Sequence, residues 1–232
     1  MKFGILGGTF NPIHFGHLRA AEEARELAGL DKVIFIPSGN PPLKTEDIAF
    51  ARHRYAMVGL AVRENPRFDL LDLECRTRTK SFTVNTLEKL RRLHPDDSLY
   101  FMLGIDAFLD IPNWHRPELL MSMTDFIVLS RPGYRFADLS ASPYLPVRRE
   151  IVRTLDSRTM PLYATKLRNG NTVMLLNVSP VTISATDIRT LIAEGKSVKY
   201  LLPADVESYI IYHKLYAFRK PQDRAVKREC RS

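Results

Sequence analysis

Cysteine is scarce in this 232-residue chain, which contains only Cys75 and Cys230. The two residues form no Cys-x-x-Cys pair and no Cys/His ligand spacing, so a disulfide framework and a structural zinc finger are excluded. No apolar run approaches the ~18–20 residues that cross a bilayer, and the apolar stretch at the N-terminus is too short for a signal peptide. We therefore expect a cytoplasmic protein with no membrane partner.

Two common nucleotide-binding fingerprints are also missing. No Gly-x-Gly-x-x-Gly follows the first predicted strand, which argues against a standard dinucleotide-binding site, and no Gly-x-x-x-x-Gly-Lys-Ser/Thr occurs, which excludes a P-loop NTPase. Glycine and proline number 11 and 15. These counts are close to average and exclude a collagen-like or largely disordered chain.

The positive charge is concentrated at the C-terminal end. The formal net charge is +8, and the twenty residues from His213 onward carry +5 of it. We interpret residues 217–232 as a basic, solvated tail whose composition allows disorder, and residues 1–216 as a single domain long enough to bury a core without staples. The mildly basic remainder suits an anionic metabolite. A basic nucleic-acid-binding module that uses the tail stays a remote alternative, and we expect no nucleic-acid partner.

Short apolar runs rich in β-branched residues alternate with longer amphipathic segments. The predicted strands are 2–6, 32–37, 68–75, 98–103, 126–129 and, as the last one, 173–178. The predicted helices are 15–28, 52–63, 84–93, 147–155, 184–194 and 204–216, of which the last two form a C-terminal helical segment. This alternation indicates an α/β fold with a doubly wound, Rossmann-like parallel sheet. In such a sheet ligands bind beyond the carboxyl ends of the strands, where the strand order reverses.

The first strand–helix junction has a composition suited to an anion. It contains Gly7-Gly8-Thr9-Phe10-Asn11-Pro12, followed by His14-Phe15-Gly16-His17. We expect the glycine pair to let the backbone leave the strand with its N–H groups exposed, and the two imidazoles to lie on one side of the helix. The helix N-terminus adds N–H donors, so the junction is predicted to bind a polyphosphate. A zinc site is excluded because no third ligand lies nearby.

A second candidate anion site begins at Ile183. Ser184 and Asp187 have the spacing of a capping box, and Ile183 with Ile188 fits a hydrophobic staple. Arg189 is unusual, because a cation in the first turns opposes the helix dipole by ~0.3–1 kcal/mol unless an anion binds there. Thr186 can add a hydroxyl group. Two helix N-termini with such side chains suggest a triphosphate.

Together the segments 7–17 and 183–189 resemble the paired motifs of the HxGH nucleotidylyltransferases, and the resemblance extends from residue 1 to about 216. Within this superfamily the chain is similar to the bacterial nicotinate-nucleotide adenylyltransferases. The positions that match their nicotinate mononucleotide site are Arg78, Ser81, Phe82, Thr83, Thr86, Gly104, Asp106, Trp114 and Arg131. One departure is Leu43, which stands before Lys44 where the family commonly has histidine.

The resemblance implies transfer of AMP from ATP to the 5′-phosphate of nicotinate mononucleotide, with Mg²⁺ carried by the ATP phosphates and no metal ligands from the protein. His14, His17 and Arg189 would be catalytic. The residues that would bind ATP are Gly8, Thr9, Phe10, Lys44, Ser184 and Thr186. Alternatives are nicotinamide mononucleotide or phosphopantetheine as acceptor. The sequence does not determine whether the chain forms a homo-oligomer.

For three features in the middle of the chain, the residues alone allow a second interpretation. Trp114 can be a core residue or an aromatic platform for a flat ring. Asp106 can bind a ribose or cap a helix, and the hydroxyl groups around Ser81 and Thr83 can bind a carboxylate or cap a helix.

Overall fold

The computed structural model describes residues 1–41, 48–76 and 80–217. Leu43, Lys44, Arg78 and the predicted basic tail beyond Ala217 therefore lie outside the described residues. Among the residues that are described, no helix has both the length and the apolar composition needed to cross a membrane.

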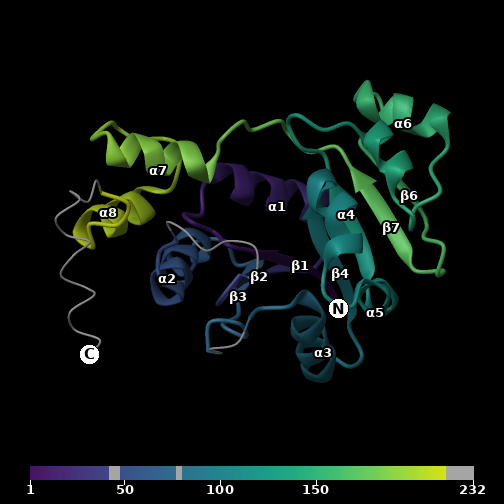
Figure 1. The fold of residues 1–232 in the computed structure, drawn as a ribbon, viewed down its shortest axis with the longest axis horizontal. Coiled ribbons are helices and arrows are strands. Elements are labelled where there is room, and N and C mark those ends of the chain that lie inside the picture. Colours follow the sequence, from purple (N-terminus) through teal and green to yellow (C-terminus); the bar gives the residue numbers. More distant parts are fainter. Residues whose placement is uncertain (42–47, 77–79, 218–232) are drawn as a thin grey trace.

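One seven-stranded sheet organises the chain, in the order β3-β2-β1-β4-β5-β7-β6 (Figure 1). The strands are β1 Lys2–Gly8, β2 Lys32–Pro37, β3 Phe68–Leu70, β4 Ser98–Gly104, β5 Asp125–Leu129, β6 Leu162–Lys166 and β7 Thr172–Leu176. All neighbouring pairs are parallel except β6 and β7. The strand order reverses between β1 and β4, so this topology places the expected ligand crevice at their carboxyl ends.

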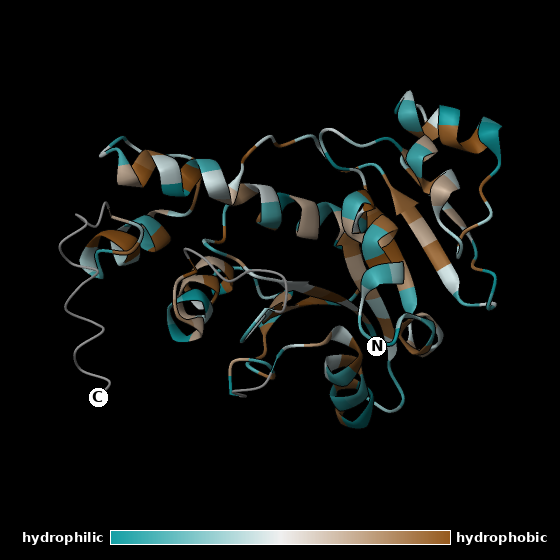
Figure 2. Ribbon diagram, viewed as in Figure 1, coloured by the Kyte–Doolittle hydropathy of each residue, from teal (hydrophilic) through white to brown (hydrophobic). Residues whose placement is uncertain are grey.

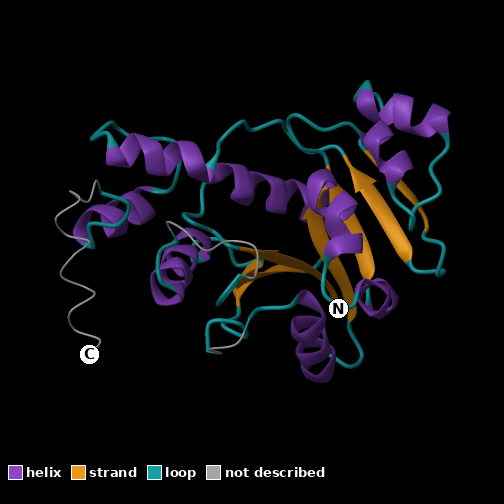
Figure 3. Ribbon diagram, in the orientation of Figure 1, coloured by secondary structure: helices purple, strands orange, loops and turns teal. Residues whose placement is uncertain are grey.

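Helices cover both faces of the sheet, which confirms the doubly wound fold (Figure 3). The α-helices are α1 Phe15–Leu27, α2 Ala51–Val62, α3 Thr83–Leu93, α4 Ile105–Asp110, α5 Pro117–Met123, α6 Arg149–Asp156, α7 Ala185–Ala193 and α8 Ala204–Tyr212. Two 3₁₀ helices, Ile111–Asn113 and Phe136–Ala141, complete the described elements.

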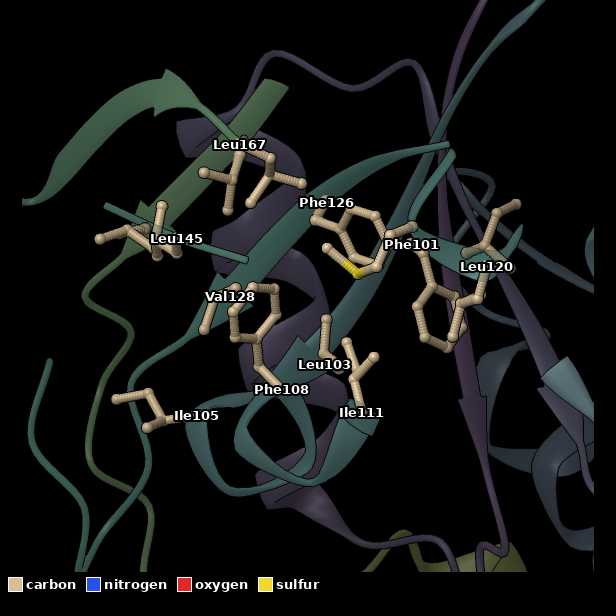
Figure 4. Close-up of a cluster of buried hydrophobic side chains, with 14 of the residues drawn as sticks. Phe101, Leu103, Ile105, Phe108, Ile111, Leu120, Phe126, Val128, Leu145 and Leu167 are labelled. Carbon is tan, nitrogen blue, oxygen red and sulfur yellow. The ribbon is translucent and has the colours of Figure 1, made fainter. Parts of the chain in front are cut away.

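The core has two parts because side chains alternate across each strand. In β1, Phe3 and Ile5 pack on the side of α3, α4, α5 and α6, where Figure 4 shows Phe101, Phe108 and Phe126 in one cluster. The other part contains buried side chains of α1, α2, α7 and α8. Figure 2 shows the result, with largely hydrophobic strands and helices that are hydrophobic on only part of their surface.

Two predicted elements end earlier than expected, and one edge strand was not predicted. The predicted strand 68–75 ends at Leu70, because the chain then turns and the Cys75 thiol donates to the Pro37 carbonyl at 3.3 Å. The strand β6 was not predicted, because its alternating, partly exposed side chains gave no continuous apolar run, and it adds an antiparallel edge to the otherwise parallel sheet. The last helix ends at Tyr212 and not at residue 216.

Candidate active site

The two predicted anion-binding segments meet in space. α1 begins just after β1, and Figure 1 shows the start of α7 beside the start of α1. The contact is direct, because Nη1 of Arg189 donates to the backbone carbonyl of Asn11 at 2.9 Å. Nη2 of Arg189 lies 3.3 Å from the Thr186 hydroxyl group. The guanidinium of α7 is thus held against the first junction, 178 residues away in sequence.

The two imidazoles stack face to face at this junction. The ring centroids of His14 and His17 are 3.7 Å apart, and the ring of Phe10 meets His17 edge-on at 5.2 Å. His14 is the N-cap residue of α1, but its side chain makes no capping hydrogen bond. His14 is 6% exposed, and within the described residues its Nδ1 has no hydrogen-bond partner.

Close approach explains two of the junction glycines. A Cβ on Gly16 would lie 3.0 Å from Nδ1 of His14, and a Cβ on Gly8 would lie 3.0 Å from the Phe10 ring. The predicted conformational role of the glycine pair was wrong, since Gly8 ends β1 and the left-handed backbone falls on Phe10, with φ of 46°. The glycines make room for the aromatic rings that line the site.

Backbone N–H groups at the starts of α7 and α1 have partners within the protein. The hydroxyl group of Ser184 accepts from the backbone N–H groups of Thr186 and Asp187 at 3.1 and 3.4 Å, which confirms Ser184 as the N-cap of α7. At the start of α1, the N–H of Phe15 already donates to the Leu201 carbonyl at 3.1 Å, so this donor is used within the protein.

His14 is neutral near pH 7. Burial, with a smaller contribution from the Arg131 charge, lowers the pKa of His14 to about 4. In the unfolded chain a histidine titrates near 6.5. The unfolded state therefore binds more protons between pH 6.5 and 4, and His14 destabilises the fold progressively as the pH falls through that window.

Replacing His14 by glutamine should flatten this pH dependence. We expect wild type to lose about 2 kcal/mol more of its free energy of unfolding between pH 7 and pH 5 than His14→Gln does, since glutamine does not titrate. Urea unfolding at both pH values measures the difference. Equal losses in the two proteins would show that His14 is not held neutral.

A cavity of about 320 Å³ lies beside the junction. The predicted residues that line it are Gly8, Thr9, Ser81, Phe82, Thr83, Thr86 and Trp114. Trp114 packs partly against the core, donates from Nε1 to Asp110 at 3.0 Å, and still faces the cavity. The core contact is therefore confirmed, and the role of an aromatic platform stays a prediction. The ring of Phe82 stacks on that of His115 at 4.2 Å, and His115 also lines the cavity.

The hydroxyl groups expected near a carboxylate have partners within the protein. Oγ of Ser81 accepts from the N–H groups of Gly39 and Asn40 at 3.1 and 3.2 Å. Oγ1 of Thr86 donates to Glu74 at 2.6 Å, and Glu74 also lines the cavity. Neither hydroxyl group caps α3, whose N-cap is Phe82 without a side-chain bond.

Gly104, Asp106 and Arg131 come together at the ends of β4 and β5. Nη1 of Arg131 lies 2.9 Å from Oδ2 of Asp106. Asp106 lies in the first turn of α4 but does not cap it. The N-cap residue is Gly104, and no side chain makes a capping hydrogen bond there. Arg131 also contributes to the shifted pKa of His14, so this ion pair lies near the histidine pair.

Sequence reasoning missed the buried Arg54. Its side chain is 1% exposed and donates to three backbone carbonyls, those of Thr9, Gly39 and Ala49, at 2.8–2.9 Å. A signal was present, because Met57 and Val58 follow at the i+3 and i+4 positions of an apolar stripe.

Glu23 was also missed. Its carboxylate accepts from the N–H and hydroxyl groups of Ser179, both at 2.5 Å, and pairs with Arg19. Burial alone would raise the pKa of Glu23, but these hydrogen bonds outweigh it and hold the pKa below its usual value. The loop that leads from β7 to α7 is thereby attached to α1.

Comparison with known proteins identifies the family. A model of the cytidylyltransferase-like family matches residues 5–191. Curated probable nicotinate-nucleotide adenylyltransferases from Syntrophotalea carbinolica and Geobacter metallireducens are 43% and 40% identical, over 93% of this chain and 97–98% of theirs. The chain belongs to the nicotinate-nucleotide adenylyltransferase family.

Solved structures agree with this assignment in fold. Plasmodium falciparum nicotinic acid mononucleotide adenylyltransferase, complexed with NaAD, matches 94% of this chain and 98% of its own, with a TM-score of 0.69 and 21% identity. The same protein complexed with APC matches with a TM-score of 0.68 and 20% identity. At these identities the likeness shows that this family member has the nucleotidylyltransferase fold.

Proposed function

We propose that this protein transfers AMP from ATP to the 5′-phosphate of nicotinate mononucleotide, giving deamido-NAD and pyrophosphate. The observation that carries the proposal is the bond from Arg189 to the Asn11 carbonyl, which brings the two anion-binding segments into one site beside the cavity. The relatives that are about 40% identical over nearly their whole length carry this activity in their names.

The reaction needs no nucleophile from the protein. An oxygen of the acceptor phosphate attacks the α-phosphorus of ATP in line, and the bond from that phosphorus to the bridging oxygen of the β-phosphate breaks to release pyrophosphate. The protein contributes orientation and stabilises the charge on the phosphoryl oxygens. Mg²⁺ would enter with ATP and shield the phosphate charge. We propose that its remaining ligands are mostly water.

We assign His17 to the α-phosphate, where its donor follows the developing charge. His14 and Lys44 would bind the phosphate chain, and the backbone of Gly8, Thr9 and Phe10 would line it. Arg189 and Thr186 would hold the β- and γ-phosphates as pyrophosphate leaves, on a helix start organised by Ser184. These assignments are supported by the stacking of the two imidazoles and by the contacts of Arg189.

The cavity would hold nicotinate mononucleotide. Trp114 would stack on the pyridine ring, and Arg78 with the segment from Ser81 to Thr83 and Thr86 would surround its carboxylate. Gly104, Asp106 and Arg131 would bind the ribose and its neighbourhood. The cavity lining and the Asp106–Arg131 ion pair support this division of the site.

Substitution of Trp114 tests the proposed acceptor site. We expect Trp114→Ala to raise the KM for nicotinate mononucleotide about tenfold, because stacking on an aromatic ring contributes ~1 kcal/mol beyond area burial, while the KM for ATP stays within twofold. Trp114→Phe should recover most of the loss. Steady-state titration of each substrate measures both values, and an equal rise in both KM values would contradict the assignment.

Pyrophosphate release with three acceptors tests the function itself. We expect turnover with nicotinate mononucleotide to exceed that with nicotinamide mononucleotide and with phosphopantetheine, each at the same concentration and with ATP in excess. A preference for either alternative would replace the proposed acceptor. Release without any acceptor sets the background.

A further inference from the structure

Asn11 is the point at which three distant segments meet in the phosphate site. Its backbone carbonyl accepts from Arg189 of α7. Its side-chain oxygen Oδ1 accepts from the N–H of Ala49, just before α2, at 3.1 Å, and from the hydroxyl group of Tyr216 at 2.8 Å. Asn11 is 6% exposed, so these bonds form in a largely dry environment.

Tyr216 reaches this point from beyond the end of α8. The helix ends at Tyr212, and the chain then curls back with Lys214 and Tyr216 both in the left-handed backbone region, at φ of 49° and 61°. Bulky residues rarely adopt that conformation, and it persists only where the surrounding structure imposes it. The left-handed turn brings the Tyr216 hydroxyl group within hydrogen-bond distance of Asn11.

The tyrosine hydroxyl is a donor at this site. Burial raises the pKa of Tyr216, and the charges of Arg189 and Arg54 offset only part of that rise. The proton therefore stays on the hydroxyl group, which donates to Oδ1 of Asn11. Both guanidinium groups therefore lie near Tyr216, and that of Arg54 also holds the Thr9 carbonyl.

Asn11 transmits the position of Tyr216 to Arg189. The side chain and the carbonyl of Asn11 share one Cα, so two donors on Oδ1 limit how far the residue can move and turn its carbonyl. Arg189 makes one contact with that carbonyl and a longer one with Thr186, at 3.3 Å. The direction of the guanidinium therefore depends mainly on Asn11.

We propose that Tyr216 is a positioning residue for the phosphate site, whose hydroxyl group holds Asn11 so that Arg189 is aimed at the departing pyrophosphate. The inference rests on the proposed adenylyl transfer. By this proposal the segment after α8 contributes to the geometry of the phosphate site.

Tyr216→Phe is the sharp test, because it removes one oxygen and keeps the ring. We expect the Kd for ATP, measured by calorimetry without an acceptor, to rise about fivefold, the equivalent of ~1 kcal/mol for one hydrogen bond. We expect kcat/KM for ATP to fall by a similar factor and the KM for nicotinate mononucleotide to stay within twofold. Unchanged ATP binding and unchanged kcat/KM would overturn the proposal.

Tyr209→Phe is the matched control. Tyr209 lies on α8, and its hydroxyl group also makes one hydrogen bond, to Nδ1 of His53 at 2.9 Å, away from Asn11. We expect this variant to bind ATP as wild type does. If both variants weaken ATP binding equally, the effect comes from a loosened α8 and the proposal fails.

A double-mutant cycle separates positioning from general stability. In an Arg189→Ala background, Tyr216→Phe should have no further effect on the Kd for ATP, because the group that it orients is gone. Additive losses would show that Tyr216 acts independently of Arg189 and would overturn the proposal. Since ATP binding is measured without an acceptor, a wrong acceptor in the proposed function would leave this result unchanged.

Discussion

His17→Ala should lower kcat by 10²-fold or more while the protein stays folded. The imidazole is assigned to the α-phosphate, and removing one such donor from a charge-stabilising site costs roughly 10²–10³ in rate. Alanine is the best helix former, and His17 is only half-buried in the first turn of α1, so the fold loses little. Pyrophosphate release at saturating ATP and nicotinate mononucleotide measures kcat.

His94→Ala is the control for this experiment. His94 lies at the opposite end of the sheet, where its ring contacts Phe3 and its Nδ1 lies 3.0 Å from Asp97. We expect it to turn over as wild type does. A near-normal kcat in His17→Ala would contradict the role assigned to His17. A large fall in the Tm of this variant would instead attribute the lost activity to unfolding.

Arg189→Ala should weaken activity and also lower the free energy of unfolding slightly. We expect kcat/KM for ATP to fall about 10²-fold, because a charge-assisted hydrogen bond to a phosphate contributes ~1.5–3 kcal/mol. The free energy of unfolding should fall by about 1–2 kcal/mol, because the lost hydrogen bond to the Asn11 carbonyl outweighs the relief from removing a cation that opposes the dipole of α7. Steady-state ATP titration and urea unfolding measure the two effects.

Lys196→Ala is the matched charge control. Lys196 follows the end of α7 and pairs with Glu194 at 2.8 Å, so its removal changes net charge equally but outside the site. We expect its kcat/KM for ATP to match that of wild type. If the two variants lose activity equally, the effect is one of overall charge and Arg189 is not a phosphate ligand.

Local patterns predicted the two helix starts well. The N-cap bond of Ser184 connects residues two and three positions apart, and the stacking of His14 on His17 follows from their spacing on one turn. Such contacts depend on the backbone of a single helix. Residue types and spacing therefore suffice to anticipate them, and the same holds for the central strands, whose continuous apolar runs require burial on both faces.

Other features had no local signal. β6 has partly exposed side chains and becomes a strand only because β7 offers it an edge. Glu74 sits in the turn after β3 and meets Thr86 only because the chain leaves the sheet earlier than its composition suggests. Arg54 resembles a solvated basic residue until three backbone carbonyls, one after β1 and two from the connection between β2 and α2, converge on it.

The sequence by itself determined the alternation of the central strands and their main helices, the residue types at both helix starts and, through the resemblance, the expected adenylyl transfer. Only the tertiary structure decided that Arg189 binds the Asn11 carbonyl, that His14 is buried and neutral, and that Tyr216 returns to the site. The reason is physical. Burial and hydrogen bonding between segments more than a hundred residues apart depend on how the strands order in the sheet, and no short window of residues contains that information.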